Sequence, residues 1–228
     1  MMTPKIVYDT ILKHEAISLQ GAIVVKMICS YFDLCNKGFK CQDFPKSRML
    51  DFDLIEKVWH SSKGKPSTSS TDGLAYTSRY LCFIEAKGWK KFLEQQNELK
   101  KATLTNQEKE RVERRIEKQV QKYQFQKKVL DSISICEEIV GESSIIGQVP
   151  ILYILVTDAT LSSEKNAQQD SITYLFQQLD YLANASTTNW EIVCASSMRD
   201  RFNESIKNVG HILPRFIQCK QLDDILLE

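Results

Sequence analysis

The stretch Asp72-Gly-Leu-Ala-Tyr-Thr-Ser-Arg-Tyr-Leu-Cys-Phe-Ile-Glu-Ala-Lys87 carries most of the information about the fold of this chain. It holds two β-prone runs, residues 72–76 and 80–87, and the three residues between them are the length of a hairpin turn. The second run is apolar almost throughout its first half, so we expect it to lie inside a sheet covered on both faces. In an antiparallel pair, the start of one strand lies beside the end of its neighbour. The pattern therefore predicts that Asp72 and Glu85 lie a few ångströms apart.

Chemically active side chains gather where the second run ends. Glu85 and Lys87 are two residues apart, so their side chains share a face of the strand, while the Ala86 carbonyl can turn toward the same pocket. Buried charges of this kind are costly unless they are paired or bind a metal, and oxygen ligands suit Mg²⁺, with Mn²⁺ as an alternative. Such an ion activates water for phosphodiester hydrolysis. Lys87 would orient that water, or accept its proton if the metal and the apolar surroundings depress the lysine pKa.

The rest of the chain predicts an α/β protein, a single domain over residues 1–228 with a central mixed sheet flanked by helices. Helices are expected at residues 5–35, 165–184 and 199–207, strands at 52–60, 150–157, 190–195 and 215–219, and turns or loops at 36–51 and 61–71. From residue 89 to about 140 the pattern is helical, with a break at 102–106. Thr105 and Glu108 have the spacing of a capping box that starts a second helix, so we expect residues 90–140 to form an antiparallel helical hairpin.

The formal net charge of +1 excludes a uniformly basic nucleic-acid coat protein, but the charge is unevenly distributed. Between Lys87 and Lys128 there are 13 basic and 6 acidic residues, a net +7, which leaves −6 for the remainder. This segment is either a solvated helical excursion or a docking face for an anion. As the candidate phosphate-contacting residues we take Lys90, Lys91, Lys100, Lys101, Arg111, Arg114 and Arg115. The same hairpin could instead hold a partner protein or a second subunit through Leu99, Val112, Ile116 and Val120.

The motif Asp72…Glu85-Ala-Lys87 resembles the PD-(D/E)xK, or restriction-endonuclease-like, nuclease superfamily, whose signature is an Asp, a spacer and Glu-x-Lys closing an apolar strand. The resemblance implies an α-β-β-β-α-β core, Asp72 and Glu85 as metal ligands, and Lys87 as the catalytic lysine. It implies a Mg²⁺-dependent nuclease that acts on a nucleic acid, with DNA as the expected substrate. The alternative is a catalytically silent module with the same fold that assembles with another protein through the hairpin.

The chain departs from the family pattern in several places. Thr71 stands where the family has Pro, and the helical segment at 90–140 is longer than the minimal core requires. Glu15 is the nearest candidate for an additional acid from the first helix, and Asp53 is a competing choice for the Asp ligand. Some relatives also carry a Gln-x-x-x-Tyr element; residues 177–181 match it, but they follow the strand at 150–157, and we interpret the match as coincidental.

Cysteine usage and hydropathy indicate the cellular environment in which the protein is expected to occur. Seven cysteines, an odd number spread through apolar segments, predict reduced and mostly buried thiols in place of a disulfide framework. The longest apolar stretch, residues 149–156, is too short for a bilayer span, and the N-terminus lacks the pattern of a secretory signal. We therefore expect a cytoplasmic protein without a membrane segment.

Overall fold

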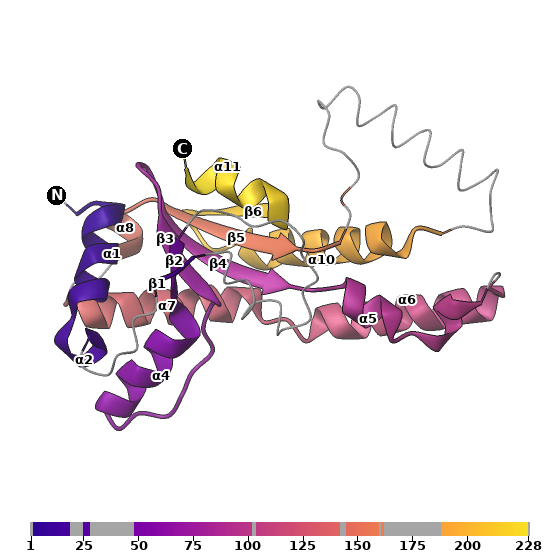
Figure 1. Ribbon diagram of the computed structural model, residues 1–228, viewed down its shortest axis with the longest axis horizontal. Helices are drawn as coiled ribbons and strands as arrows, with labels where there is room; N and C mark the ends of the chain where they lie inside the picture. The colour runs from indigo at the N-terminus through magenta and orange to yellow at the C-terminus, as the bar shows by residue number, and fades with distance from the viewer. Residues whose placement is uncertain are drawn as a thin grey trace.

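The computed structural model describes residues 2–18, 25–27, 48–101, 104–141, 145–159, 161 and 188–227. Its central feature is a mixed six-stranded sheet in which the strands follow their sequence order, β1 to β6 (Figure 1). The strands are β1 (Val25–Met27), β2 (Arg48–Asp51), β3 (Gly73–Tyr76), β4 (Leu81–Lys87), β5 (Ile151–Thr157) and β6 (Ile212–Gln218). The first four strands pair antiparallel, and β4, β5 and β6 run parallel. The predicted α/β architecture with a mixed sheet is thus confirmed.

The hairpin of β3 and β4 forms as the sequence predicts, with Gly73 opposite Ile84. Asp72, the residue just before β3, therefore stands beside the end of β4. Leu81 and Phe83 pack into the larger hydrophobic core, whereas Cys82, Ile84 and Ala86 pack into a smaller one. Both faces of β4 are covered, and Glu85 shares the face of Leu81 and Phe83 because side chains alternate along a strand.

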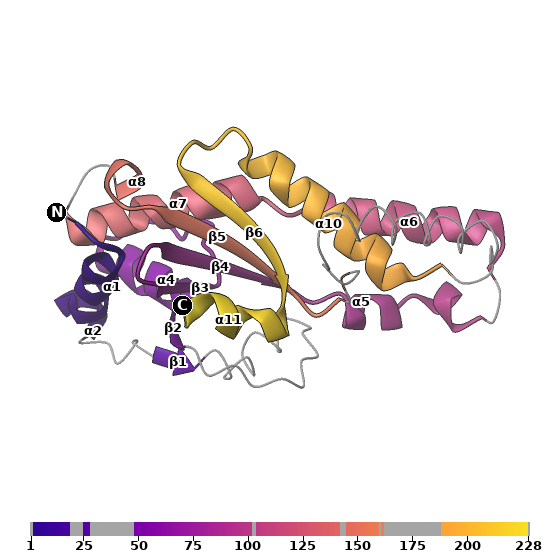
Figure 2. The same cartoon turned by 90° about the horizontal axis from the view of Figure 1, so that it is seen from above.

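Helices cover the two faces of the sheet unequally. The larger core is built against helices α1 (Pro4–Lys13), α4 (Phe52–Ser62), α7 (Phe125–Val140) and α10 (Trp190–Ile206), and the smaller core against α11 (Leu222–Leu226). Figure 2 shows α7 running along the sheet and α11 near β6. The remaining short helices are α2 (Glu15–Ser18), α8 (Ile145–Gln148) and the 3₁₀ turn at Cys219–Gln221.

The basic segment extends away from the sheet and returns to it. The outgoing arm holds a short helix, α5 (Lys90–Glu94), and a 3₁₀ turn at Asn97–Lys100, and the returning arm is α6 (Asn106–Gln121), which continues into α7 after a break at 122–124 (Figures 1 and 2). The predicted capping box is present: Thr105 Oγ1 accepts from the Glu108 N–H, and the Glu108 carboxylate accepts from the Thr105 N–H. The outgoing arm is less helical than predicted, and the helix of the returning arm is interrupted at residues 122–124.

Three predicted elements were wrong. Residues 52–60 form helix α4 and no strand, because the Asp51 side chain caps it by accepting from the Leu54 N–H and its buried residues recur at helical spacing. Residues 190–195 likewise begin α10, which Asn189 caps. In place of the single helix expected at 5–35, the described residues form two helices, α1 and α2, and residues 25–27 form strand β1. The expected helix at 165–184 lies outside the described residues.

Candidate active site

Asp72, Glu85 and Lys87 meet at the end of β4, as the hairpin register predicts. The Lys87 Nζ forms an ion pair with Glu85 Oε1 and lies 3.9 Å from Asp72 Oδ2. Both carboxylate side chains have no exposed surface, and the Lys87 side chain is 16% exposed. The sheet therefore holds two acids and a lysine in one buried cluster that opens to solvent on the lysine side.

Ala86 ties the cluster to the backbone of β4. Its N–H donates to Asp72 Oδ2 at 2.7 Å, and its carbonyl accepts a hydrogen bond from the Lys87 Nζ at 3.1 Å. The hydrogen bond from the backbone fixes one oxygen of Asp72 beside Glu85. The carbonyl oxygen is thus turned toward the Lys87 ammonium.

Lys128 is the residue of this cluster that sequence reasoning missed. Its Nζ lies 2.8 Å from Glu85 Oε1 and 3.0 Å from Oε2, so one ammonium spans both oxygens of the carboxylate. Lys128 stands on the first turns of α7 beside the buried Phe125 and Val129. A lysine on the apolar face of a helix was the available signal, because a charged residue at such a position needs a buried partner.

The charges of the cluster oppose one another. Burial, followed by the nearby charge of Asp72, raises the pKa of Glu85, while Lys87 and Lys128 act against that rise. Burial alone would lower the pKa of Lys87, but the negative charges of Glu85 and Asp72 outweigh it and raise that pKa above its ordinary value. The two carboxylates thus hold the lysine as an ammonium.

Aromatic residues border the cluster on two sides. The Lys87 Nζ lies 5.4 Å from the centre of the Tyr123 ring, whose hydroxyl accepts from the Gln119 Nε2 at 3.3 Å. Gln119 and Tyr123 have the Gln-x-x-x-Tyr spacing that we assigned only to residues 177–181, which lie outside the described residues. On the other side, the buried Tyr153 hydroxyl has no hydrogen-bond partner within the described ranges, and its pKa is raised by burial and then by Glu85 and Asp72.

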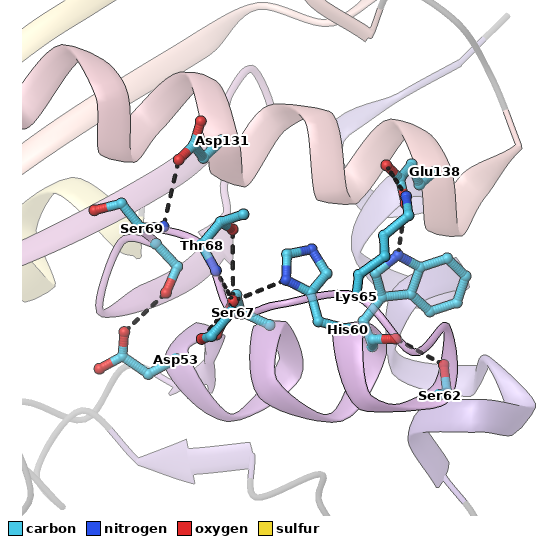
Figure 3. A network of polar contacts seen from close by, with 12 residues as sticks. Asp53, His60, Ser62, Lys65, Ser67, Thr68, Ser69, Asp131 and Glu138 are labelled. Atoms are coloured by element: carbon cyan, nitrogen blue, oxygen red, sulfur yellow. Dashed lines mark hydrogen bonds and ion pairs between the residues drawn. The ribbon is translucent and has the colours of Figure 1, made fainter.

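The segment that leads into Asp72 is held by side chains of α4 and α7, between which it lies in Figure 3. The Glu56 carboxylate accepts from the Ser67 hydroxyl at 2.8 Å and from the Thr68 N–H. The Ser69 N–H donates to Asp131 Oδ2 at 3.3 Å. Finally, the Thr71 N–H donates to Ser132 Oγ at 2.9 Å, with both residues fully buried. Helix α7 therefore positions both carboxylates, Glu85 through Lys128 and Asp72 through Ser132.

The two other candidate acids lie on helices α4 and α2. Asp53 lies in the first turn of α4, where its Oδ1 accepts a hydrogen bond from the Ser70 hydroxyl at 2.9 Å. Glu15 is exposed at the start of α2. Among these acids, Asp72 is the one whose charge raises the pKa of Glu85. Asp72 is thus the acid that the structure brings to Glu85.

The seven candidate phosphate-contacting residues divide into two groups. Lys101 pairs with Glu108, Arg114 with Glu110 at 3.4 Å, and Arg115 with Glu98 at 2.8 Å. Lys90, Lys91, Lys100 and Arg111 make no ion pair among the described residues. Val112, Ile116 and Val120 are buried in the larger core, so these side chains face the protein itself. Trp89, which follows the motif, is also fully buried and donates from Nε1 to the Met198 sulfur.

Comparison of the chain with protein-family models, with curated proteins and with solved structures found no match. Within the described ranges, no group of three or more His, Cys, Asp or Glu side chains is arranged to hold a metal ion. None of the described helices is long and apolar enough to cross a membrane. Cys82, Cys136, Cys194 and Cys219 are buried thiols that form no disulfide with one another, in agreement with the prediction; the other three cysteines lie outside the described residues.

Proposed function

We propose that this chain is a metal-dependent nuclease of the PD-(D/E)xK type, which hydrolyses phosphodiester bonds at the cluster of Asp72, Glu85 and Lys87. The observation that carries the proposal is the convergence of these three side chains at the end of a buried central strand. The order of elements supports it: N-terminal helices, antiparallel strands β1 to β4 with helix α4 between β2 and β3, a helical segment, and β5 parallel to β4. Residues 90–140 are then the helical addition to the core.

The donor set fits a hard divalent ion such as Mg²⁺. Asp72, Glu85 and the Ala86 carbonyl supply only oxygen ligands, and Mg²⁺ sites use one or two carboxylates together with waters and substrate phosphate. The absence of a third acid among the described residues is therefore compatible with this ion. The Tyr153 hydroxyl has no hydrogen-bond partner among the described residues and is affected by the charges of both carboxylates, so it is a donor or acceptor that a water in the site can use.

Each residue of the site has a distinct role in this proposal. Asp72 and Glu85 would hold the ion, which supplies Lewis acidity and an activated water. The Asp72 carboxylate is fixed by the Ala86 N–H, so its position needs no reorganisation. Lys87 stays an ammonium, since its pKa is raised, and it orients the attacking water or stabilises negative charge on the phosphate. Tyr123 supports that ammonium through its ring.

DNA is the substrate that we propose first, with RNA as the competing possibility. Lys90, Lys91, Lys100 and Arg111 form no ion pair with another described residue. Phosphate contacts from such residues bind without reading sequence. The arm leaves the sheet directly after Lys87, so a backbone that lies along it passes the end of β4 (Figure 2).

The test is cleavage of supercoiled plasmid, single-stranded DNA and single-stranded RNA with Mg²⁺ or Mn²⁺, using the wild type, Glu85→Gln and Lys87→Met. Each variant should lose about a hundredfold or more of the metal-dependent rate, the usual scale for the loss of a charged catalytic group. Glu113→Gln, at an exposed position of α6, is the matched control and should cleave at the wild-type rate. Equal rates for Glu85→Gln and the control would refute the mechanism.

A catalytically silent module is the second candidate, and one observation favours it. The two carboxylates face two lysines, so the cluster is neutral without a metal. In that case the chain binds no divalent ion and cleaves nothing, while a partner contacts the polar outer face of the arm. Calorimetric titration with Mn²⁺ separates the candidates, because a silent module shows no heat of binding that depends on Glu85.

A further inference from the structure

The ammonium of Lys128 contacts both oxygens of the Glu85 carboxylate. It is 2.8 Å from one oxygen of the carboxylate and 3.0 Å from the other, so it spans the group as a single cation. Glu85 has no exposed surface, and the Lys128 side chain is 23% exposed. The outer side of the carboxylate is therefore occupied by a group that reaches it from α7 while remaining partly in contact with water.

The charge balance of the cluster does not allow a simple addition of a divalent ion. Asp72 and Glu85 together contribute two negative charges, and Lys87 and Lys128 contribute two positive charges. A divalent ion added to this set would leave two uncompensated positive charges beside fully buried carboxylates. Because an unpaired buried charge is strongly unfavourable, binding of the ion requires that one ammonium leave.

Lys128 is the ammonium with the fewest ties to the cluster. Lys87 is bound to Glu85, to the Ala86 carbonyl at 3.1 Å and to the Tyr123 ring, and it also lies near Asp72. The Lys128 ammonium, by contrast, has polar contacts only with Glu85 in the described part of the chain. Its long side chain also comes from a neighbouring helix and not from β4 itself. Rotation of that side chain removes it from Glu85 without moving the sheet.

We propose that Lys128 is an exchangeable counter-ion, which holds Glu85 in the metal-free chain and leaves the carboxylate when a divalent ion binds. The inference rests on the proposed metal site. In this role Lys128 is a positioning residue: it keeps Glu85 in place between binding events, and it competes directly with the ion. A lysine that served the folded structure alone would keep its contact whether or not the ion is bound.

The experiment is calorimetric titration of Mn²⁺ into the wild type, Lys128→Met, Lys128→Arg and Lys127→Met. Lys127 is the exposed neighbour of Lys128 on α7 and gives the matched control. Loss of a hydrogen-bonded ion pair that competes with the ion should tighten Mn²⁺ binding to Lys128→Met by about tenfold or more. Lys128→Arg keeps a competing cation and should bind within about threefold of the wild type, as should Lys127→Met.

The outcomes separate this inference from the proposed function. Equal Mn²⁺ affinities of Lys128→Met and Lys127→Met would overturn the exchange while leaving the metal site intact. Absence of Mn²⁺ binding in every variant would overturn both. A second measurement does not depend on a variant that folds: the ¹³Cε resonance of Lys128 in the wild-type chain should shift as Mg²⁺ saturates the site. A resonance that stays in place while Mg²⁺ binds would contradict the exchange.

Discussion

Replacement of Ser132 by alanine tests how α7 holds the segment before Asp72. Ser132 Oγ accepts the Thr71 N–H at 2.9 Å and lies 3.2 Å from Thr71 Oγ1, and neither residue has exposed surface. Removal of the hydroxyl leaves a buried backbone donor without its partner, which costs about 1–3 kcal/mol. Alanine is the better helix former by about 0.5 kcal/mol, so part of this loss is offset.

Ser134→Ala isolates the hydrogen bond from helix propensity. Ser134 lies on the same helix and is exposed, so its replacement changes propensity alone and should slightly stabilise the chain. The difference in unfolding free energy between Ser132→Ala and Ser134→Ala should therefore be about 1–3 kcal/mol. For a chain of this length, each kcal/mol lowers Tm by about 2–4 °C.

The assay is urea and thermal unfolding followed by circular dichroism at 222 nm, with the two variants compared at the same protein concentration and pH. A double-mutant cycle with Thr71→Val then gives the share of the hydroxyl–hydroxyl contact. If Ser132→Ala and Ser134→Ala unfold within about 0.5 kcal/mol of each other, the Thr71 N–H is satisfied in some other way, and the reasoning fails.

Three further predictions concern groups away from the site. Burial raises the pKa of Cys82 to about 12, so little of its thiol is ionised at pH 8. Iodoacetamide at pH 8, followed by mass spectrometry, should therefore modify Cys82 only after the chain is unfolded. Modification of the folded chain at the same rate as the unfolded chain would contradict this prediction. The pKa of Glu108 is lowered from 4.5 to about 2, first by Lys101 and then by the Thr105 N–H. Because the pKa of Glu108 is lower in the folded than in the unfolded chain, the ionised carboxylate stabilises α6 fully above pH 4.5, and this stabilisation is lost as the pH falls to about 2. A carboxyl ¹³C titration of Glu108 with a midpoint near 4.5 would contradict this prediction. Phe202→Ala should lower the free energy of unfolding by about 3–5 kcal/mol, since the Phe202 ring is fully buried between Phe125 and Tyr153. Phe216 is only half-buried, so Phe216→Ala should lower it clearly less in the same chemical unfolding experiment. Equal losses for the two variants would contradict this packing.

The errors in the expected secondary structure have a common physical cause. Residues 52–60 and 190–195 are short apolar runs with β-branched or aromatic members, which suit a strand as well as one face of a helix. Each run is a helix because a side chain caps it, Asp51 in one case and Asn189 in the other, and because the core accepts its buried face. Capping geometry and the surrounding core are not contained in the apolar pattern.

The motif residues could be predicted because their proximity depends on local geometry. Hairpin length and strand alternation bring Asp72, Glu85 and Lys87 together, and both are properties of one short stretch. The same holds for the capping box of α6, where Thr105 and Glu108 are three residues apart.

Other members of the site come from distant parts of the chain. Lys128 reaches Glu85 across 43 positions, and Ser132 reaches Thr71 across 61. Nothing in the spacing of the sequence indicates that α7 lies along the sheet.

The sequence by itself determined the central hairpin, the acid pair with its lysine, and the uneven charge of the chain, because these follow from neighbouring residues. Only the tertiary structure decided that helix α7 carries Lys128 and Ser132, the residues that position the two acids. Packing of α7 against the sheet makes those contacts, and packing depends on the burial of whole helix faces and not on any single motif.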